Sequence, residues 1–208
     1  RASNQDSGYA GYHLFFVADG MGGHAGGDIA SALASQRIAR LDEFYPTPEA
    51  AREAMLTVIQ EANDALTETV NQHNELAGMG TTFSGAIFSG GKVVLAHIGD
   101  SRIYLVRNAK LLQRSRDHSY AEKHIMIRGQ ADPMNRNILF TCLGSPVAPL
   151  FDVSDPIFLH EGDRVLLCSD GLWSELSDEH IAEQLALGRV QDAVPMLVDE
   201  ALERGGAH

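Results

Sequence analysis

Hydrophobic residues recur at helical spacing in the first third of the chain. Between residues 28 and 41, about one helical turn separates the successive apolar residues Ile29, Leu33, Ile38 and Leu41. This spacing predicts a helix with one buried side. A second helix is predicted to begin after Thr47, because a threonine cap followed by Pro48 and an acidic residue is typical of a first helical turn. Its apolar stripe continues to Leu76, and Gly78 is expected to end it.

After residue 80 the pattern changes to the shorter period of strands. Two apolar runs joined by Gly90 and Gly91 predict an antiparallel hairpin, because a two-residue turn returns the chain alongside itself. The last two predicted strands are also expected to pair with each other. The predicted strands cover residues 14–18, 81–89, 92–98, 103–106, 157–160 and 164–168, and two further predicted helices cover 178–187 and 191–204. This order predicts an α+β fold in which amphipathic helix pairs pack against antiparallel sheet.

Three aspartates stand where a buried strand would meet its loop. Asp19, Asp100 and Asp170 each end a mostly apolar run. Taken singly, each would more often be a turn residue, since Asp-Gly and Gly-Asp are common in loops. Taken together, carboxylates beside a core need a shared positive partner, because desolvating an unpaired one costs several kcal/mol. A divalent cation would supply that charge, and oxygen donors favour magnesium or manganese over zinc.

The charge of the chain excludes one class of partner. Sixteen basic and 28 acidic residues give a net charge of −12, so we expect no nucleic-acid binding through a basic face. No apolar run approaches the ~18 residues of a membrane span, and we expect a single cytoplasmic, monomeric domain. Cys142 and Cys168 lie in apolar surroundings and are expected to be reduced core thiols.

Five short motifs follow one another over most of the chain. They are RASNQDS at 1–7, FVADGMGGH at 16–24, GMGTT at 78–82, HIGDSR at 97–102 and CSDGLW at 168–173. In this order the chain resembles the PP2C-type, metal-dependent serine/threonine protein phosphatases in their bacterial form. The resemblance implies an α-β-β-α sandwich of two antiparallel sheets flanked by helix pairs, with metal ions in the cleft between the sheets.

The resemblance also implies a set of metal ligands. Asp19 would bridge two manganese or magnesium ions, Asp170 would bind one of them, and the backbone carbonyl of Gly20 would bind the other. Asp6 would complete the shell of the second ion, directly or through water. Asp100 together with Asp170 matches the third, weaker ion of bacterial members. Gln5, beside Asp6, stands where many relatives carry glutamate.

Two further residues receive catalytic roles by resemblance. Arg1 would grip the phosphate, because a guanidinium group presents donors that fit two phosphate oxygens. His24 would protonate the leaving serine or threonine oxygen, since histidine titrates near neutrality. The alternatives are a disordered terminus for Arg1 and a solvated loop residue for His24. Ser101 and Ser169 flank ligands without a paired base, so we do not expect them to be nucleophiles.

Two parts of the chain depart from the family pattern. Residues 1–208 read as one PP2C-like catalytic domain that lacks the first and last strands of the family, including the Asp-Asn pair expected after Gly206. The stretch 119–137, where relatives carry a flap over the cleft, is a few residues short. We expect Asp117 and His118, just before it, to shape the wall of the site and Arg102 to support the Asp100 loop by a local ion pair.

The sequence therefore predicts a protein phosphatase that hydrolyses phosphoserine and phosphothreonine with a metal-bound hydroxide. Its expected partners are phosphorylated protein substrates of a cognate serine/threonine kinase. The alternative function is a catalytically weak PP2C-like module that binds a phosphoprotein or a kinase.

Overall fold

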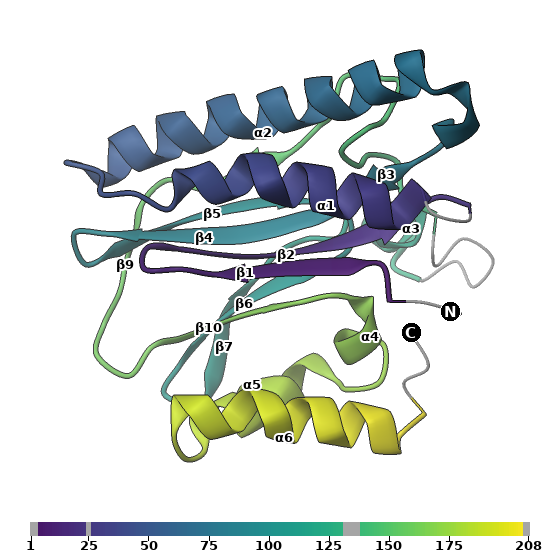
Figure 1. Ribbon diagram of the computed structural model, residues 1–208. Helices are drawn as coiled ribbons and strands as arrows, with labels where there is room; N and C mark the ends of the chain where they lie inside the picture. Colours follow the sequence, from purple (N-terminus) through teal and green to yellow (C-terminus); the bar gives the residue numbers. More distant parts are fainter. Residues whose placement is uncertain (1–3, 24–25, 131–137, 206–208) are drawn as a thin grey trace.

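Two antiparallel sheets stack face to face, and helices cover the outer face of each (Figure 1). The computed structural model describes residues 4–23, 26–130 and 138–205. One apolar cluster lies between the first sheet and its helices, a second between the two sheets, and a third between the second sheet and its helices. The predicted α-β-β-α sandwich is confirmed.

The first sheet is built around the strand that carries Asp19 near its end. In the part of the chain that the structure describes, its strands are β1 (Asp6–Ala10), β2 (Leu14–Met21), β3 (Gly80–Thr81), β4 (Phe83–Ser89), β5 (Lys92–Ile98), β8 (Asp152–Val153) and β9 (Ile157–Phe158). The predicted hairpin joins β4 to β5, with φ of +56° at Gly90 and +74° at Gly91. Two successive positive φ values match a type I′ turn, which explains the glycine pair.

The second sheet contains β10 (Arg164–Cys168), β6 (Arg102–Arg107) and β7 (Lys110–Arg114), in that order. Here one prediction is wrong, because β9 and β10 do not pair with each other. Strand β9 pairs with β5 of the first sheet, whereas β10 pairs with β6 of the second. Residues 161–163 therefore carry the chain between the two sheets, and the local pattern of two apolar runs did not reveal this.

Four main helices form the two outer layers. Helices α1 (Gly26–Ile38) and α2 (Pro48–Gln72) cover the first sheet, and α5 (Asp178–Ala186) and α6 (Val190–Glu203) cover the second (Figure 1). The Thr47 hydroxyl accepts the Ala50 N–H at 3.1 Å, which confirms the predicted cap of α2. Helix α2 ends at Gln72, before the predicted Leu76, because His73 leaves the helical region and a short 3-10 turn, η2 (Asn74–Leu76), follows.

Short elements that have weak hydrophobic periodicity were missed from the sequence. They are β1, β7, β8, α3 (Tyr120–Arg128) and the four-residue α4 (Asp170–Trp173). The helix predicted for 28–41 consists of α1 followed by the 3-10 turn η1 (Ala39–Leu41). None of the helices within the described ranges is long and apolar enough to cross a membrane.

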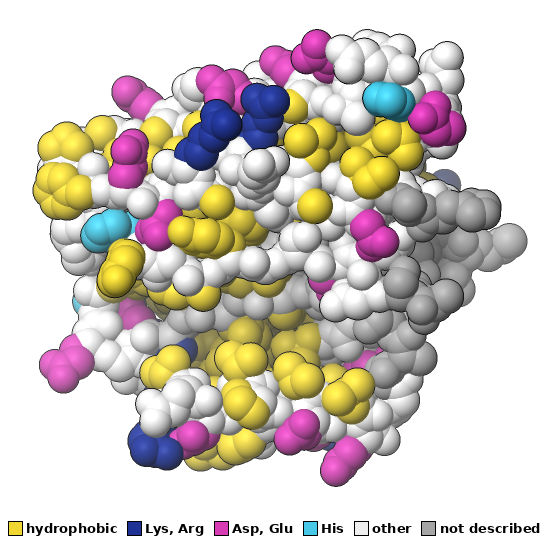
Figure 2. Space-filling model, viewed as in Figure 1, with side chains coloured by type: hydrophobic (Ala, Val, Ile, Leu, Met, Phe, Trp, Pro, Cys, Tyr) yellow, Lys and Arg dark blue, Asp and Glu magenta, His cyan; other side chains and the backbone are white. Residues whose placement is uncertain are grey.

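Helix α6 is apolar on two sides. Ala193, Leu197 and Ala201 are buried against the second sheet, whereas Val194 and Val198 are about half exposed. Figure 2 shows hydrophobic side chains gathered above α6, around the hollow that separates it from the first sheet. Only one apolar side of this helix therefore packs into the described core.

Candidate metal centre

Both sheets contribute carboxylates to one edge of the sandwich. The antiparallel register of β1 and β2 places Asp6 opposite Asp19. The Ser169 hydroxyl, which follows β10 in the second sheet, donates to Asp6 Oδ2 at 2.9 Å. Asp170 comes directly after Ser169. This hydrogen bond therefore brings the end of β10, with Asp170, to the start of β1. The structure thus joins two predicted ligand segments that are more than 160 residues apart in the chain.

Asp19 is buried and its backbone is fixed by the two threonines of the GMGTT motif. The Asp19 N–H donates to Thr82 Oγ1 at 2.9 Å, and Thr81 Oγ1 donates to the Asp19 carbonyl at 3.0 Å. The Thr82 hydroxyl also shares a hydrogen bond of 2.7 Å with the Ser101 hydroxyl. The strand end that carries Asp19 is therefore tied to the loop that carries Asp100. The motif itself did not reveal this role for the threonines.

The pKa of Asp100 reflects the negative charges that surround this carboxyl group. Burial, followed by the charges of Asp170, Asp117 and Asp19, raises the pKa of Asp100 to about 7. Carboxylates that repel one another in this way are stabilised when a cation binds among them. The donor set that the structure brings together consists of oxygen atoms and fits a hard divalent ion.

Gly20 lies where a side chain cannot be placed. A Cβ at this position would lie 2.1 Å from the Gly27 carbonyl oxygen and 2.7 Å from that of Gln5. The Gly20 N–H donates to the same Gln5 carbonyl at 3.1 Å. The glycine after Asp19 thus allows the segment before β1 and the start of α1 to approach the metal-ligand strand closely.

Arg102 supports the Asp100 loop indirectly. Its guanidinium group makes two hydrogen bonds to Asp117, at 2.9 and 2.7 Å, and a third to Asp178 at 3.1 Å. The same group lies 3.7 Å from the ring centroid of Trp173, whose Nε1 donates to the Asp100 carbonyl at 2.8 Å. The expected ion pair exists, and its partners are Asp117 and Asp178. No sequence signal pointed to Asp178, which reads only as a first-turn acid of α5.

Hydroxyl and thiol side chains beside the ligands are unsuited to nucleophilic attack. Ser101 is fully buried and bonded to Thr82, and Ser169 is bonded to Asp6. Burial and the charge of Asp100 raise the pKa of Cys142 to about 11, and burial raises that of Cys168 to about 12. Both cysteines are free, as the sequence predicted, although Cys142 is only partly buried. With these pKa values the thiols are protonated at neutral pH.

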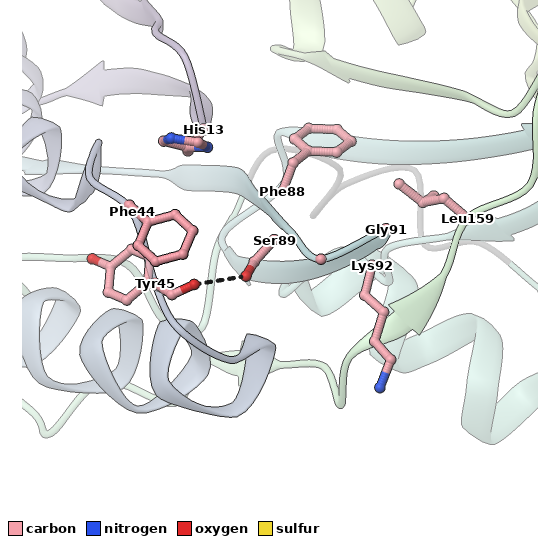
Figure 3. A pocket seen from close by; sticks show the side chains of 9 residues that line it. His13, Phe44, Tyr45, Phe88, Ser89, Gly91, Lys92 and Leu159 are labelled. Carbon is pink, nitrogen blue, oxygen red and sulfur yellow. Dashed lines mark hydrogen bonds between the residues drawn. The ribbon is translucent and has the colours of Figure 1, made fainter.

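A separate hollow lies at the opposite end of β5, beside the Gly90-Gly91 turn (Figure 3). It has a volume of about 210 Å³, and its lining includes Phe44, Phe88, Leu159 and Lys92. Because no carboxylate lines it, this apolar hollow does not belong to the acidic site.

Comparison with known proteins agrees with this geometry. Residues 2–200 match the family described as Protein phosphatase 2C. The chain belongs to this family. It is 37% identical over 213 residues to the serine/threonine protein phosphatase PstP of Mycobacterium tuberculosis, covering 99% of this chain and 40% of PstP. It is 33% identical over 204 residues to the serine/threonine phosphatase Stp of Listeria monocytogenes, covering 93% of this chain and 80% of Stp.

A solved PP2C-family structure shows the same fold. The catalytic domain of PstP in complex with two manganese ions superposes with a TM-score of 0.85 and 38% identity, over 100% of this chain and 88% of that one. The chain spans only about 40% of the full mycobacterial relative. The two manganese ions belong to the PstP structure.

Two predicted site residues, Arg1 and His24, lie outside the described residues. Among the residues that are described, no three His, Cys, Asp or Glu side chains converge closely enough to hold a metal ion by themselves. In a PP2C-family site, carboxylates would therefore need backbone carbonyls or water to complete the coordination of an ion.

Proposed function

We propose that this protein is a manganese- or magnesium-dependent phosphatase of phosphoserine and phosphothreonine in proteins. One observation carries the proposal: strand ends from both sheets bring Asp6, Asp19, Asp100 and Asp170 to one edge of the sandwich. Membership of the Protein phosphatase 2C family and the manganese ions in the PstP structure support it.

We infer a site for two ions and a weaker third. Asp19 would bridge two ions, with Asp170 and the Gly20 carbonyl each binding one, and Asp6 would complete the shell of the second ion, directly or through water. Asp100 and Asp170 would hold the third. When bound, the ions neutralise the phosphate charge and activate water for attack on phosphorus.

The chain's own side chains would position the substrate and move the proton. A phosphate monoester dianion repels nucleophiles, so it must be held in place while charge is neutralised. Arg1 would bind two phosphate oxygens, and His24 would give its proton to the departing serine or threonine oxygen. Both roles rest on the sequence motifs.

The biological setting belongs to the same proposal. The expected substrates are proteins phosphorylated by a cognate serine/threonine kinase, and the expected state is a cytoplasmic monomer. The net charge of −12 argues against a nucleic-acid partner.

Hydrolysis of a phosphothreonine peptide by the purified protein tests the function. Phosphate release should depend on added manganese or magnesium and stop with a chelator. Binding of the phosphopeptide without any turnover, at saturating metal, would contradict the enzyme and favour the binding module.

A further inference from the structure

His118 holds the backbone of the residue that precedes Asp100. The His118 N–H donates to the Gly99 carbonyl at 2.7 Å, and the Gly99 N–H donates to His118 Nδ1 at 3.3 Å. On its other side the imidazole places Nε2 3.1 Å from Asp152 Oδ2. Both backbone groups of Gly99 are therefore bound by this one residue.

The partners of the ring determine its tautomer. A backbone N–H can only donate, so Nδ1 of His118 must carry no proton. A carboxylate at neutral pH can only accept, so the proton resides on Nε2 and is donated to Asp152. In the other neutral tautomer the proton would be on Nδ1, and the Nδ1–H and the Gly99 N–H would face each other as two donors. The carboxylate of Asp152 at Nε2 therefore keeps Nδ1 available as an acceptor.

The Gly99 turn has little freedom to compensate for a change at His118. Its φ is +101°, a conformation that side chains rarely adopt, and a Cβ here would lie 2.6 Å from Thr82 Cγ2. The following carbonyl, that of Asp100, is bound by Trp173 Nε1. The direction of the Asp100 side chain is therefore set by the His118 and Trp173 contacts on either side of the turn.

Asp152 contacts His118 but is not one of the clustered aspartates of the proposed metal site. It lies on β8, opposite His97 in the pairing with β5, and its side chain is 73% exposed. A contact with a side chain this exposed contributes little to stability. Asp152 contacts His118, however, which is only 8% exposed, so this contact can orient a buried ring.

We propose that His118 is a positioning residue for Asp100 and that Asp152 fixes the His118 tautomer required for this. The consequence for metal binding rests on the proposed function, in which Asp100 holds the weaker ion. Asp152 is then a surface residue that controls the affinity of that ion without touching it.

The first test needs neither metal nor activity. In ¹⁵N-detected NMR spectra of the metal-free protein, His118 should be the Nε2–H tautomer in the native sequence and in Asp152→Asn, whose amide oxygen still accepts. In Asp152→Ala the ring should show a mixture of tautomers, and the Gly99 amide should exchange with solvent about 10-fold faster or more. Asp155→Ala is the matched control, because Asp155 is a 97% exposed aspartate in the same segment.

The second test measures the manganese dependence of phosphopeptide hydrolysis. Asp152→Ala should need roughly 10-fold more manganese for half-maximal rate, with kcat restored at saturating metal, whereas Asp152→Asn and Asp155→Ala should match the native protein. Equal effects of Asp152→Asn and Asp152→Ala would overturn the tautomer argument, and unchanged His118 and Gly99 signals in Asp152→Ala would overturn the positioning role. An inactive native protein would contradict the proposed function alone, since the NMR test would still decide the role of His118.

Discussion

Removal of the Asp117 carboxylate should destabilise the protein and weaken its metal site at the same time. Asp117 is 5% exposed and accepts two hydrogen bonds from Arg102 and one from Arg114, at 3.3 Å. Burial alone would lower the pKa of Arg102, but the hydrogen bonds and charge of Asp117 outweigh it and raise that pKa. Arg102 nevertheless remains charged when its main partner is removed, because a guanidinium group does not lose its proton in proteins.

The loss of stability in Asp117→Ala can be sized from the cost of leaving the buried charge of Arg102 poorly paired. In Asp117→Ala, the described acidic partner left to Arg102 is Asp178, which it already shares with Arg114, beside a hydrogen bond to the neutral Tyr104 hydroxyl. Breaking one side of a buried ion pair costs about 3–5 kcal/mol. For a chain of this size we expect Tm to fall by roughly 6–20 °C. Because Arg102 stacks on Trp173, the Asp100 loop should also loosen, and manganese should stabilise the variant less than the native protein.

The opposite end of β6 provides a matched control. Arg107 makes a similar two-point contact with Asp163, at 2.8 and 2.6 Å, and this contact lies away from the acidic group. Asp163→Ala should also lower stability, measured by urea unfolding, but should leave manganese-dependent stabilisation and phosphatase activity unchanged. Two results would refute the reasoning: a loss below ~1 kcal/mol in Asp117→Ala, typical of an exposed pair, or an equal loss of metal response in both variants.

Three further predictions address ligands, pH and catalysis. Asp19→Ala should abolish both turnover and manganese-dependent thermal stabilisation, whereas Asp100→Ala should only lower turnover; full occupancy by two ions in Asp19→Ala would contradict the bridging role. Burial and the charge of the adjacent His118 lower the pKa of His97 to about 4, so about 3 kcal/mol of stability should be present above pH 6.5 and lost as pH falls toward 4. Urea unfolding of His97→Gln should lack that slope, and an equal slope would assign it to other groups. Arg1→Ala should mainly raise KM, and His24→Ala should lose on the order of 10²-fold more activity on a phosphopeptide than on p-nitrophenyl phosphate, whose leaving group needs no proton; equal losses on both substrates would remove the acid role of His24.

Strong local signals predicted several elements almost to the residue. Strand β5 has the bounds that the apolar pattern indicated, and the Gly90-Gly91 turn has the positive φ values that glycine permits. The Thr47 cap of α2 was likewise readable, because a side chain three residues from its N–H partner needs no tertiary contact. Edge strands such as β1, with three of its five residues exposed, carry too little apolar contrast for this kind of prediction.

The sequence by itself determined the α+β class, the strand ends that carry Asp19, Asp100 and Asp170, and the oxygen-rich character of the site. These follow from local periodicity and from the cost of burying unpaired carboxylates. The α-β-β-α sandwich was implied by the resemblance of the ordered motifs to the PP2C family. Only the tertiary structure decided that β9 and β10 belong to different sheets, that Ser169 meets Asp6, and that Asp152 reaches Gly99 through His118. Pairing between distant segments depends on which surfaces pack together, and hydrogen bonds such as these form only after the two sheets and their loops are in place.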